Sequence, residues 1–132
     1  MVQVGRGDER IGLEHDLVDR TTVREAGDVL RRCALFVGCD SGLLHLATAV
    51  GTPSIGLFGP TDPYVVFDER DPMTPITNAR PCAPCWNGPL TMLAPGVCPR
   101  QIDSCLEPIG VGAVLDAASR ILERTIPADR CA

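Results

Sequence analysis

Short apolar runs and amphipathic stretches alternate along the first half of this 132-residue chain. Apolar runs at residues 2–5, 34–39 and 54–58 predict strands. The pattern of a helix separates the last two runs at residues 42–50, and apolar positions at helical spacing precede them at residues 23–33. Strands that alternate with helices predict an α/β fold in which a parallel sheet is flanked by helices.

Local signals mark where some helices begin. Thr22 and Glu25 stand three positions apart at the start of the first helical stretch, which is the pattern of a capping box. The run Thr61-Asp62-Pro63 is typical of a turn that leads into a helix. A further short helix is expected over residues 9–16, after a polar loop.

The chain changes character after residue 58. Most of its 12 prolines and four of its seven cysteines lie between Gly59 and Pro108. This region is expected to be irregular apart from a short strand near residues 74–77, so it needs another source of order, such as a metal ion. An amphipathic helix is predicted from Val111 to about Arg124, and residues 126–132 are expected to form a frayed tail.

Charge and composition exclude several classes of function. The net charge is −5, with no basic patch and a single Tyr and Trp, so a nucleic-acid partner is not expected. All 12 basic residues are arginines, which excludes a lysine-dependent phosphate loop within this chain. No apolar run is long enough to span a bilayer, and the first residues lack the zones of a signal peptide. A cytoplasmic location is therefore expected.

The clearest chemistry lies where the predicted strand ending at Cys39 turns into a helix. The first N–H groups of a helix are unpaired and carry partial positive charge, so they suit an anion such as a phosphate. Gly42 lets a ligand approach the backbone, Asp40 and Ser41 are good N-cap residues, and His45 shares a helix face with Ser41. The alternative is that these residues form only a cap and a tight turn, with His45 half-buried.

The cysteines allow two interpretations. Two close thiols followed by two later ones, in the spacing C-x2-C-x12-C-x6-C, can close a tetrahedral site for Zn²⁺ or iron; they are Cys82, Cys85, Cys98 and Cys105. Ordinary reduced thiols in a loop are the other interpretation. Such a closed site is structural, because it leaves no open position for catalysis. Cys33 and Cys39 are expected to be buried in the core, and Cys131 to be incidental.

One long compound motif resembles a known family. The run from Phe36 to Pro63 joins Asp-Ser-Gly-x-x-His-x-Ala to Gly-x-Pro and Phe-Gly-Pro-Thr-Asp-Pro, and it resembles the signature of the family 9 glycosyltransferases. These are the ADP-heptose:lipopolysaccharide heptosyltransferases and their relatives. The resemblance extends from Val2 to about Leu122 and includes the cysteine-bearing loop.

The resemblance implies a GT-B fold, of which this chain would be the donor-side, Rossmann-like portion. Residues 1–125 would form that nucleotide-sugar-binding domain, incomplete at its N-terminus and including a Cys-rich loop at residues 78–107. The acceptor-side domain with the general base, and the family's phosphate-binding lysine, would lie outside this chain. No cofactor is implied for catalysis, and the cysteine loop of some relatives holds iron or zinc.

The resemblance also implies roles for single residues. The backbone at Ser41, Gly42 and Leu43 would meet the diphosphate of an ADP-heptose donor, His45 would bind the same phosphate, and Asp40 would face the sugar. Weaker matches place the adenine near Thr21 and Thr22, and the ribose hydroxyls near Asp8 or Glu9. The acceptor would be a lipopolysaccharide core or a protein, in the cytoplasm or at the surface of the inner membrane.

Two other functions stay open at the level of sequence. The chain can be a catalytically inactive, metal-stapled binding or assembly module that keeps the fold without the reaction. It can also belong to another GT-B enzyme, such as a nucleotide-sugar epimerase, although the cysteine loop and the Phe-Gly-Pro-Thr-Asp-Pro run argue against that.

Overall fold

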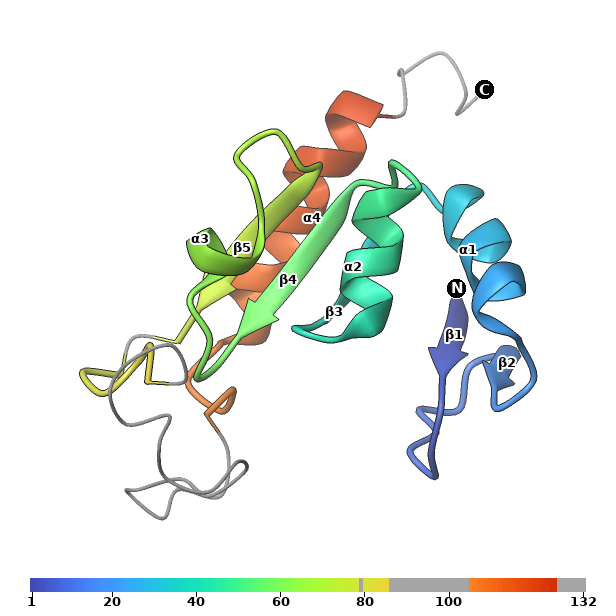
Figure 1. Cartoon of the computed structure of the whole chain (residues 1–132), viewed down its shortest axis with the longest axis horizontal. Coiled ribbons are helices and arrows are strands. Elements are labelled where there is room, and N and C mark those ends of the chain that lie inside the picture. Colours follow the sequence, from blue (N-terminus) through green and yellow to red (C-terminus); the bar gives the residue numbers. More distant parts are fainter. Residues whose placement is uncertain (79, 86–104, 126–132) are drawn as a thin grey trace.

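The computed structural model describes residues 1–78, 80–85 and 105–125. Their strands form two parallel sheets (Figure 1). One sheet has two strands, β1 (Val2–Gly5) and β2 (His15–Val18). The other has the order β3-β4-β5, formed by β3 (Phe36–Cys39), β4 (Ser54–Phe58) and β5 (Met73–Thr77). The predicted α/β fold with parallel sheets flanked by helices is confirmed.

The helices lie on both faces of the three-stranded sheet. In Figure 1, α2 (Gly42–Ala49) lies in front of this sheet and α4 (Val111–Thr125) behind it. The first helix, α1 (Val23–Arg31), lies beside α2, and the single turn α3 (Pro63–Val66) follows β4. This layering is consistent with part of a Rossmann-like domain.

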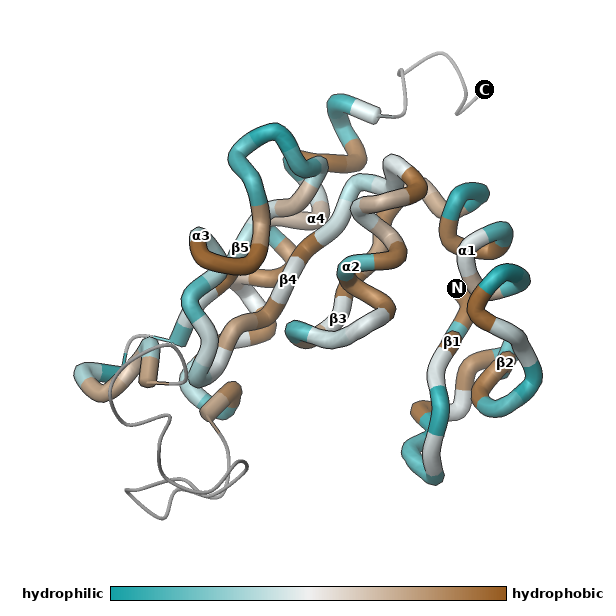
Figure 2. Tube along the Cα trace, viewed as in Figure 1, coloured by the Kyte–Doolittle hydropathy of each residue, from teal (hydrophilic) through white to brown (hydrophobic). Residues whose placement is uncertain are grey.

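The core lies on both faces of β4, against α2 on one face and α4 on the other. The side chains of Leu44, Ala47, Ile55 and Phe58 have no exposed surface, and Figure 2 shows apolar residues recurring in α2, β4 and α4. Gly56 allows α2 to approach β4 closely, because a Cβ atom there would lie 2.9 Å from Leu44 Cδ2 and 2.6 Å from Phe58 Cε2. Close packing of the helix on the strand therefore holds the segment that follows β3.

The two sheets are joined through α1 and not through paired strands. Gly27 of α1 faces Leu46 of α2, where a Cβ atom at residue 27 would make ordinary contact at 3.5 Å. The Thr52 hydroxyl donates to the Leu30 carbonyl at 2.8 Å, which ties the end of α1 to the loop before β4. Helix α1 thus carries the β1–β2 sheet beside β3.

Most of the predicted elements are confirmed, with boundaries that shift by a residue or two. The capping box at Thr22 and Glu25 is present, strand 54–58 has the predicted limits, and Asp62 caps α3 with Pro63 in its first turn. The strand expected over residues 34–39 begins at Phe36. The tail at residues 126–132 lies outside the described residues.

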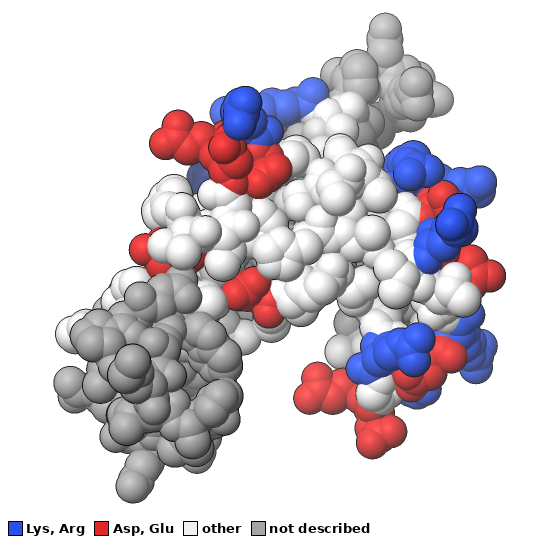
Figure 3. Space-filling model, viewed as in Figure 1, with Lys and Arg blue, Asp and Glu red and all other residues white. Residues whose placement is uncertain are grey.

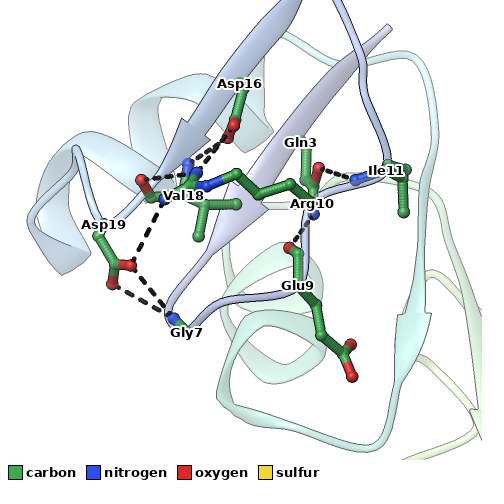
Figure 4. A network of polar contacts seen from close by, with 8 residues as sticks. All are labelled: Gln3, Gly7, Glu9, Arg10, Ile11, Asp16, Val18 and Asp19. Carbon is green, nitrogen blue, oxygen red and sulfur yellow. Dashed lines mark hydrogen bonds and ion pairs between the residues drawn. The ribbon is translucent and has the colours of Figure 1, made fainter.

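The prediction of a helix over residues 9–16 is wrong. Residues 15–18 of this region form β2, and the residues before them form a loop. The Gln3 side chain holds that loop, since its amide donates to the Glu9 carbonyl at 2.8 Å and accepts from the Ile11 N–H at 3.0 Å (Figure 4). These tertiary contacts replace the hydrogen bonds that a helix would have made within the segment.

No helix of the described part of the chain is long and apolar enough to cross a bilayer.

Candidate functional site

The N-terminus of α2 presents unpaired backbone donors. Ser41 is the N-cap residue in an extended conformation, and its carbonyl accepts from the N–H groups of Leu44 at 3.0 Å and His45 at 3.3 Å. The N–H groups of Gly42 and Leu43 have no acceptor among the described residues. These two donors and the dipole of α2 give this end of the helix partial positive charge.

The space next to these donors is open. The Ser41 side chain makes no capping hydrogen bond to the helix, so its hydroxyl is available to another partner. A Cβ atom built on Gly42 would meet nothing within 4 Å. The turn therefore leaves its own amide groups accessible. In a purely structural cap, a side chain of the turn would accept hydrogen bonds from them.

His45 lies beside Asp40 at this helix end. Its Nε2 atom is 3.7 Å from Asp40 Oδ1, an ion pair when the imidazole is protonated, and the two side chains are 50% and 21% exposed. The imidazole stacks on Phe67, with ring centroids 4.4 Å apart and an interplanar angle of 12°. Phe67 in turn meets Phe58 edge-on, with centroids 6.0 Å apart. A chain of aromatic contacts thus connects His45 to the core.

Cys39 adjoins the same site, and the prediction that it is buried in the core is wrong. It is exposed because no strand among the described residues neighbours β3 on the side away from β4. Partial desolvation raises the pKa of the Cys39 thiol, and the charges of Glu9 and Asp40 raise it further. Glu9 belongs to the loop after β1, so its charge acts on Cys39 from the other sheet.

The other predicted contact residues lie at the same edge of the fold. The carboxyl ends of parallel strands point the same way, so the segments after β1, β2 and β3 gather at the lower edge in Figure 1. These segments carry Asp8 and Glu9, Thr21 and Thr22, and the start of α2. The hydroxyl of Thr22 is engaged in its capping box, 2.8 Å from Glu25 Oε2, so Thr21 is the better placed of the two threonines.

Charge is unevenly spread around this edge. Figure 3 shows charged residues of both signs over the α1 side, a mostly uncharged surface over the middle of the molecule with acidic atoms near its lower border, and a recess between the two at the lower edge. Open α/β sheets bind ligands outside the carboxyl ends of their strands. The recess has the position that such a site requires.

The predicted metal site is only partly described. Cys82, Cys85 and Cys105 are half-buried, whereas Cys98 lies outside the described residues. No group of three metal-ligating side chains occurs within residues 1–78, 80–85 and 105–125, so the three described cysteines do not form a site by themselves. Cys33, expected in the core, is half-buried, and its thiol donates to the Val29 carbonyl.

Sequence reasoning missed a residue that anchors the segment around Cys105. Asn78 is 7% exposed, and its amide donates to the carbonyls of Gly59 at 3.2 Å and Cys105 at 2.7 Å. It thus connects the ends of β4 and β5 to residues far along the chain. Phe67 was also missed. Its partner His45 lies 22 positions away, and no local sequence pattern links the two residues.

A comparison with models of known protein families finds a match to this chain. The model of glycosyltransferase family 9 (heptosyltransferase) matches residues 9–92, which is more than half of the chain. No solved structure gives a significant match.

Individual relatives carry the names of heptosyltransferases. The chain is 46% identical over 61 residues to lipooligosaccharide heptosyltransferase 2 of Haemophilus influenzae, which covers 46% of this chain and 18% of that protein. It is 36% identical over 75 residues to lipopolysaccharide heptosyltransferase 1 of Pseudomonas aeruginosa, covering 56% of this chain and 21% of that protein. The matched part therefore spans about a fifth of the length of these curated relatives.

Proposed function

Because this chain belongs to glycosyltransferase family 9, the heptosyltransferases, we propose that it is the donor-binding part of an enzyme that transfers heptose from ADP-heptose. The acceptor is a lipopolysaccharide core or a protein. Reaction takes place in the cytoplasm or at the inner surface of the inner membrane, where a nucleotide sugar is available. Residues 1–125 supply the donor side of that site.

The observation that carries this proposal is the pair of unpaired N–H groups at Gly42 and Leu43, with His45 beside them. Their N–H dipoles bind the diphosphate of the donor in the ground state. As the bond between sugar and diphosphate breaks, negative charge grows on the leaving group, and fixed dipoles stabilise it without reorganising. Protonated His45 adds positive charge, and Asp40 faces the sugar. The base that deprotonates the acceptor hydroxyl comes from outside this chain.

Calorimetric titration of the chain with ADP tests this site. His45→Ala removes a hydrogen bond to a charged group, worth about 1.5–3 kcal/mol, so the Kd should rise roughly tenfold or more. Gly42→Val should abolish binding, because its side chain fills the open space over the helix end.

Thr48→Ala is the matched control, since Thr48 lies in the same helix and its hydroxyl donates only to the His45 carbonyl. Circular dichroism checks that each variant is folded. Equal ADP binding by all three variants, or no binding by the unaltered chain, would contradict the donor site. A chain that binds a stoichiometric metal ion but no ADP would instead be the inactive assembly module.

We also propose that Cys82, Cys85, Cys98 and Cys105 hold a structural Zn²⁺ or iron ion. What supports this is their spacing, together with the anchoring of Cys105 by Asn78 and of Cys85, whose N–H donates to the Pro60 carbonyl at 2.8 Å. The ion would staple the loop and take no part in transfer. Elemental analysis of the purified chain should give one metal ion per chain, reduced to a trace in Cys82→Ser. Cys33→Ser should keep the metal, and a metal-free wild-type chain would overturn this proposal.

A further inference from the structure

The loop between β1 and β2 is exposed, yet hydrogen bonds hold its backbone. Residues 6–12 are all exposed, and loops of this kind are usually among the more mobile parts of a fold. Here the Gly7 N–H donates to the Asp19 carboxylate at 3.3 Å, and Arg10 donates to the Asp16 carboxylate at 2.8 Å (Figure 4). The loop is therefore tied to β2 and to the turn that follows it.

Gln3 of β1 holds the same loop from the other strand. Its side-chain amide donates to the Glu9 carbonyl at 2.8 Å and accepts from the Ile11 N–H at 3.0 Å. These two backbone groups belong to the peptide units on either side of Arg10, and each unit is planar. The Cα atom of Glu9 lies in the first of these planes, so Gln3 sets the point from which the Glu9 side chain leaves the loop.

The Glu9 carboxylate itself has no hydrogen-bond or ion-pair partner among the residues that the structure describes, and it is exposed. Figure 4 shows it pointing away from Arg10, whose guanidinium is engaged with Asp16 and lies 3.9 Å from the Asp19 carboxylate. A held backbone that carries a free carboxylate is the arrangement of a binding group ordered before its ligand arrives. Such order lowers the entropy cost of binding.

Of the two carboxylates in this loop, Glu9 is the one whose charge acts on the candidate site. Desolvation contributes most to the raised pKa of the Cys39 thiol, and the charge of Glu9 raises it further, whereas no such effect comes from Asp8. Cys39 directly precedes Asp40 and the N-cap of α2. The loop after β1 and the start of α2 also gather at the same sheet edge (Figure 1).

We infer that Gln3 is a positioning residue that holds Glu9 to accept hydrogen bonds from the ribose hydroxyls of the donor, so that the site selects ribonucleotides over 2′-deoxyribonucleotides. This inference rests on the proposed donor site and adds to it a residue that does not touch the ligand. The two oxygens of a carboxylate accept but do not donate, so they can bind the adjacent 2′- and 3′-hydroxyls together. Gln3 contributes only through Glu9.

Three probes separate the ribose from the phosphates in calorimetric titrations of the full chain: ADP, 2′-deoxy-ADP and inorganic pyrophosphate. The unaltered chain should bind 2′-deoxy-ADP roughly tenfold or more weakly than ADP, the range for a hydrogen bond to a charged group. Glu9→Gln should greatly reduce this selectivity. Gln3→Leu should reduce it to a similar extent, while the Kd for pyrophosphate stays unchanged because that probe has no ribose.

A double variant tests whether Gln3 acts through Glu9. Adding Gln3→Leu to Glu9→Gln should cause no further loss of selectivity, since residues that act as a unit are not additive. Gln3→Glu keeps an acceptor for the Ile11 N–H and loses only the donor to the Glu9 carbonyl, so it should give an intermediate selectivity. This milder variant also serves if Gln3→Leu does not fold, as judged by circular dichroism.

Glu14→Gln and Asp8→Asn are the matched controls, because each removes an exposed carboxylate from the same loop. Both should keep the selectivity for ribose. Loss of selectivity in Asp8→Asn but not in Glu9→Gln would overturn the assignment.

The remaining outcomes distinguish this inference from the donor site on which it rests. Equal affinity of the unaltered chain for ADP and 2′-deoxy-ADP, or full selectivity in both Gln3 variants, would overturn the inference and leave the donor site standing. Weaker pyrophosphate binding by Gln3→Leu, in parallel with ADP, would show that Gln3 only stabilises the fold and would also overturn it. An unaltered chain that binds neither ADP nor pyrophosphate would overturn both the inference and the donor site.

Discussion

At the scale of single residues, the start of α2 combines features that serve an anion better than a cap. Ser41 has the conformation of an N-cap, yet its side chain makes no bond to the helix. Gly42 does not need a glycine for its backbone conformation, but it leaves the approach to the amides open. Both features are expected if the unpaired N–H groups at the start of α2 bind a ligand. In a structural cap, the Ser41 side chain would accept a hydrogen bond from at least one of these N–H groups.

Phe67 positions His45, and its removal should weaken ADP binding without unfolding the chain. The stacked ring holds the imidazole beside Asp40, so Phe67→Ala leaves the histidine free to adopt other rotamers. We expect a several-fold rise in the Kd for ADP, corresponding to about 0.5–1.5 kcal/mol of aromatic contact. Phe67→Tyr keeps the stacking surface and should restore binding. Equal loss in both variants would show that the effect is not due to stacking.

At the scale of elements, the capping box decides where α1 begins. The Thr22 hydroxyl accepts from the Glu25 N–H at 3.3 Å, and Glu25 Oε2 accepts from the Thr22 N–H at 2.8 Å. Helix α1 joins the β1–β2 sheet to the rest of the fold. The stability of its first turn therefore affects the positions of Glu9 and Thr21, which lie in the loops that follow β1 and β2. Thr22→Ala should lower the free energy of unfolding by about 1 kcal/mol, measured by urea denaturation.

Acid should weaken the same cap. The hydrogen bonds from the Thr22 backbone and hydroxyl lower the pKa of Glu25 below its ordinary value of 4.5. A carboxylate whose pKa is lower in the folded state stabilises the fold above its unfolded pKa, and that stability is lost as the pH falls through the folded pKa. The contribution of Glu25 should therefore be complete at pH 7 and decline below about pH 4.5. Glu25→Gln should flatten this part of the pH dependence in urea denaturation. An unchanged slope would contradict the assignment.

At the scale of the whole molecule, the proposed function assigns to this chain only the donor side of a transfer reaction. In this proposal the helix-end donors stabilise the leaving diphosphate, and the base that deprotonates the acceptor lies outside this chain. The chain alone should therefore show no turnover with ADP-heptose and a lipid A–Kdo acceptor. Activity should appear when the N-terminal part of a relative is supplied. Clear turnover by the chain alone would contradict the proposal that it supplies only the donor side of the reaction.

Most of the helices and strands, and the start of the candidate site, could be predicted from the sequence because they depend on neighbouring residues. Strand 54–58 is a continuous apolar run because it is buried between α2 and α4, and α1 begins at Thr22 because Thr22 and Glu25 satisfy each other's backbone groups over three positions. The turn from Cys39 into α2 is likewise local, since the unpaired donors of a helix start depend only on where the helix begins.

The remaining features depend on contacts between distant segments. Residues 9–16 did not form a helix because Gln3 and Arg10 bind this region to β1 and β2. Cys39 is exposed because none of the described strands pairs with β3 on the side away from β4. His45 is held by a ring 22 positions away. The sequence alone determined the local elements and the family, because these rest on neighbouring residues and an unbroken motif. Only the tertiary structure decided which side chains hold the exposed loop after β1, because these hydrogen bonds join residues that no local pattern connects.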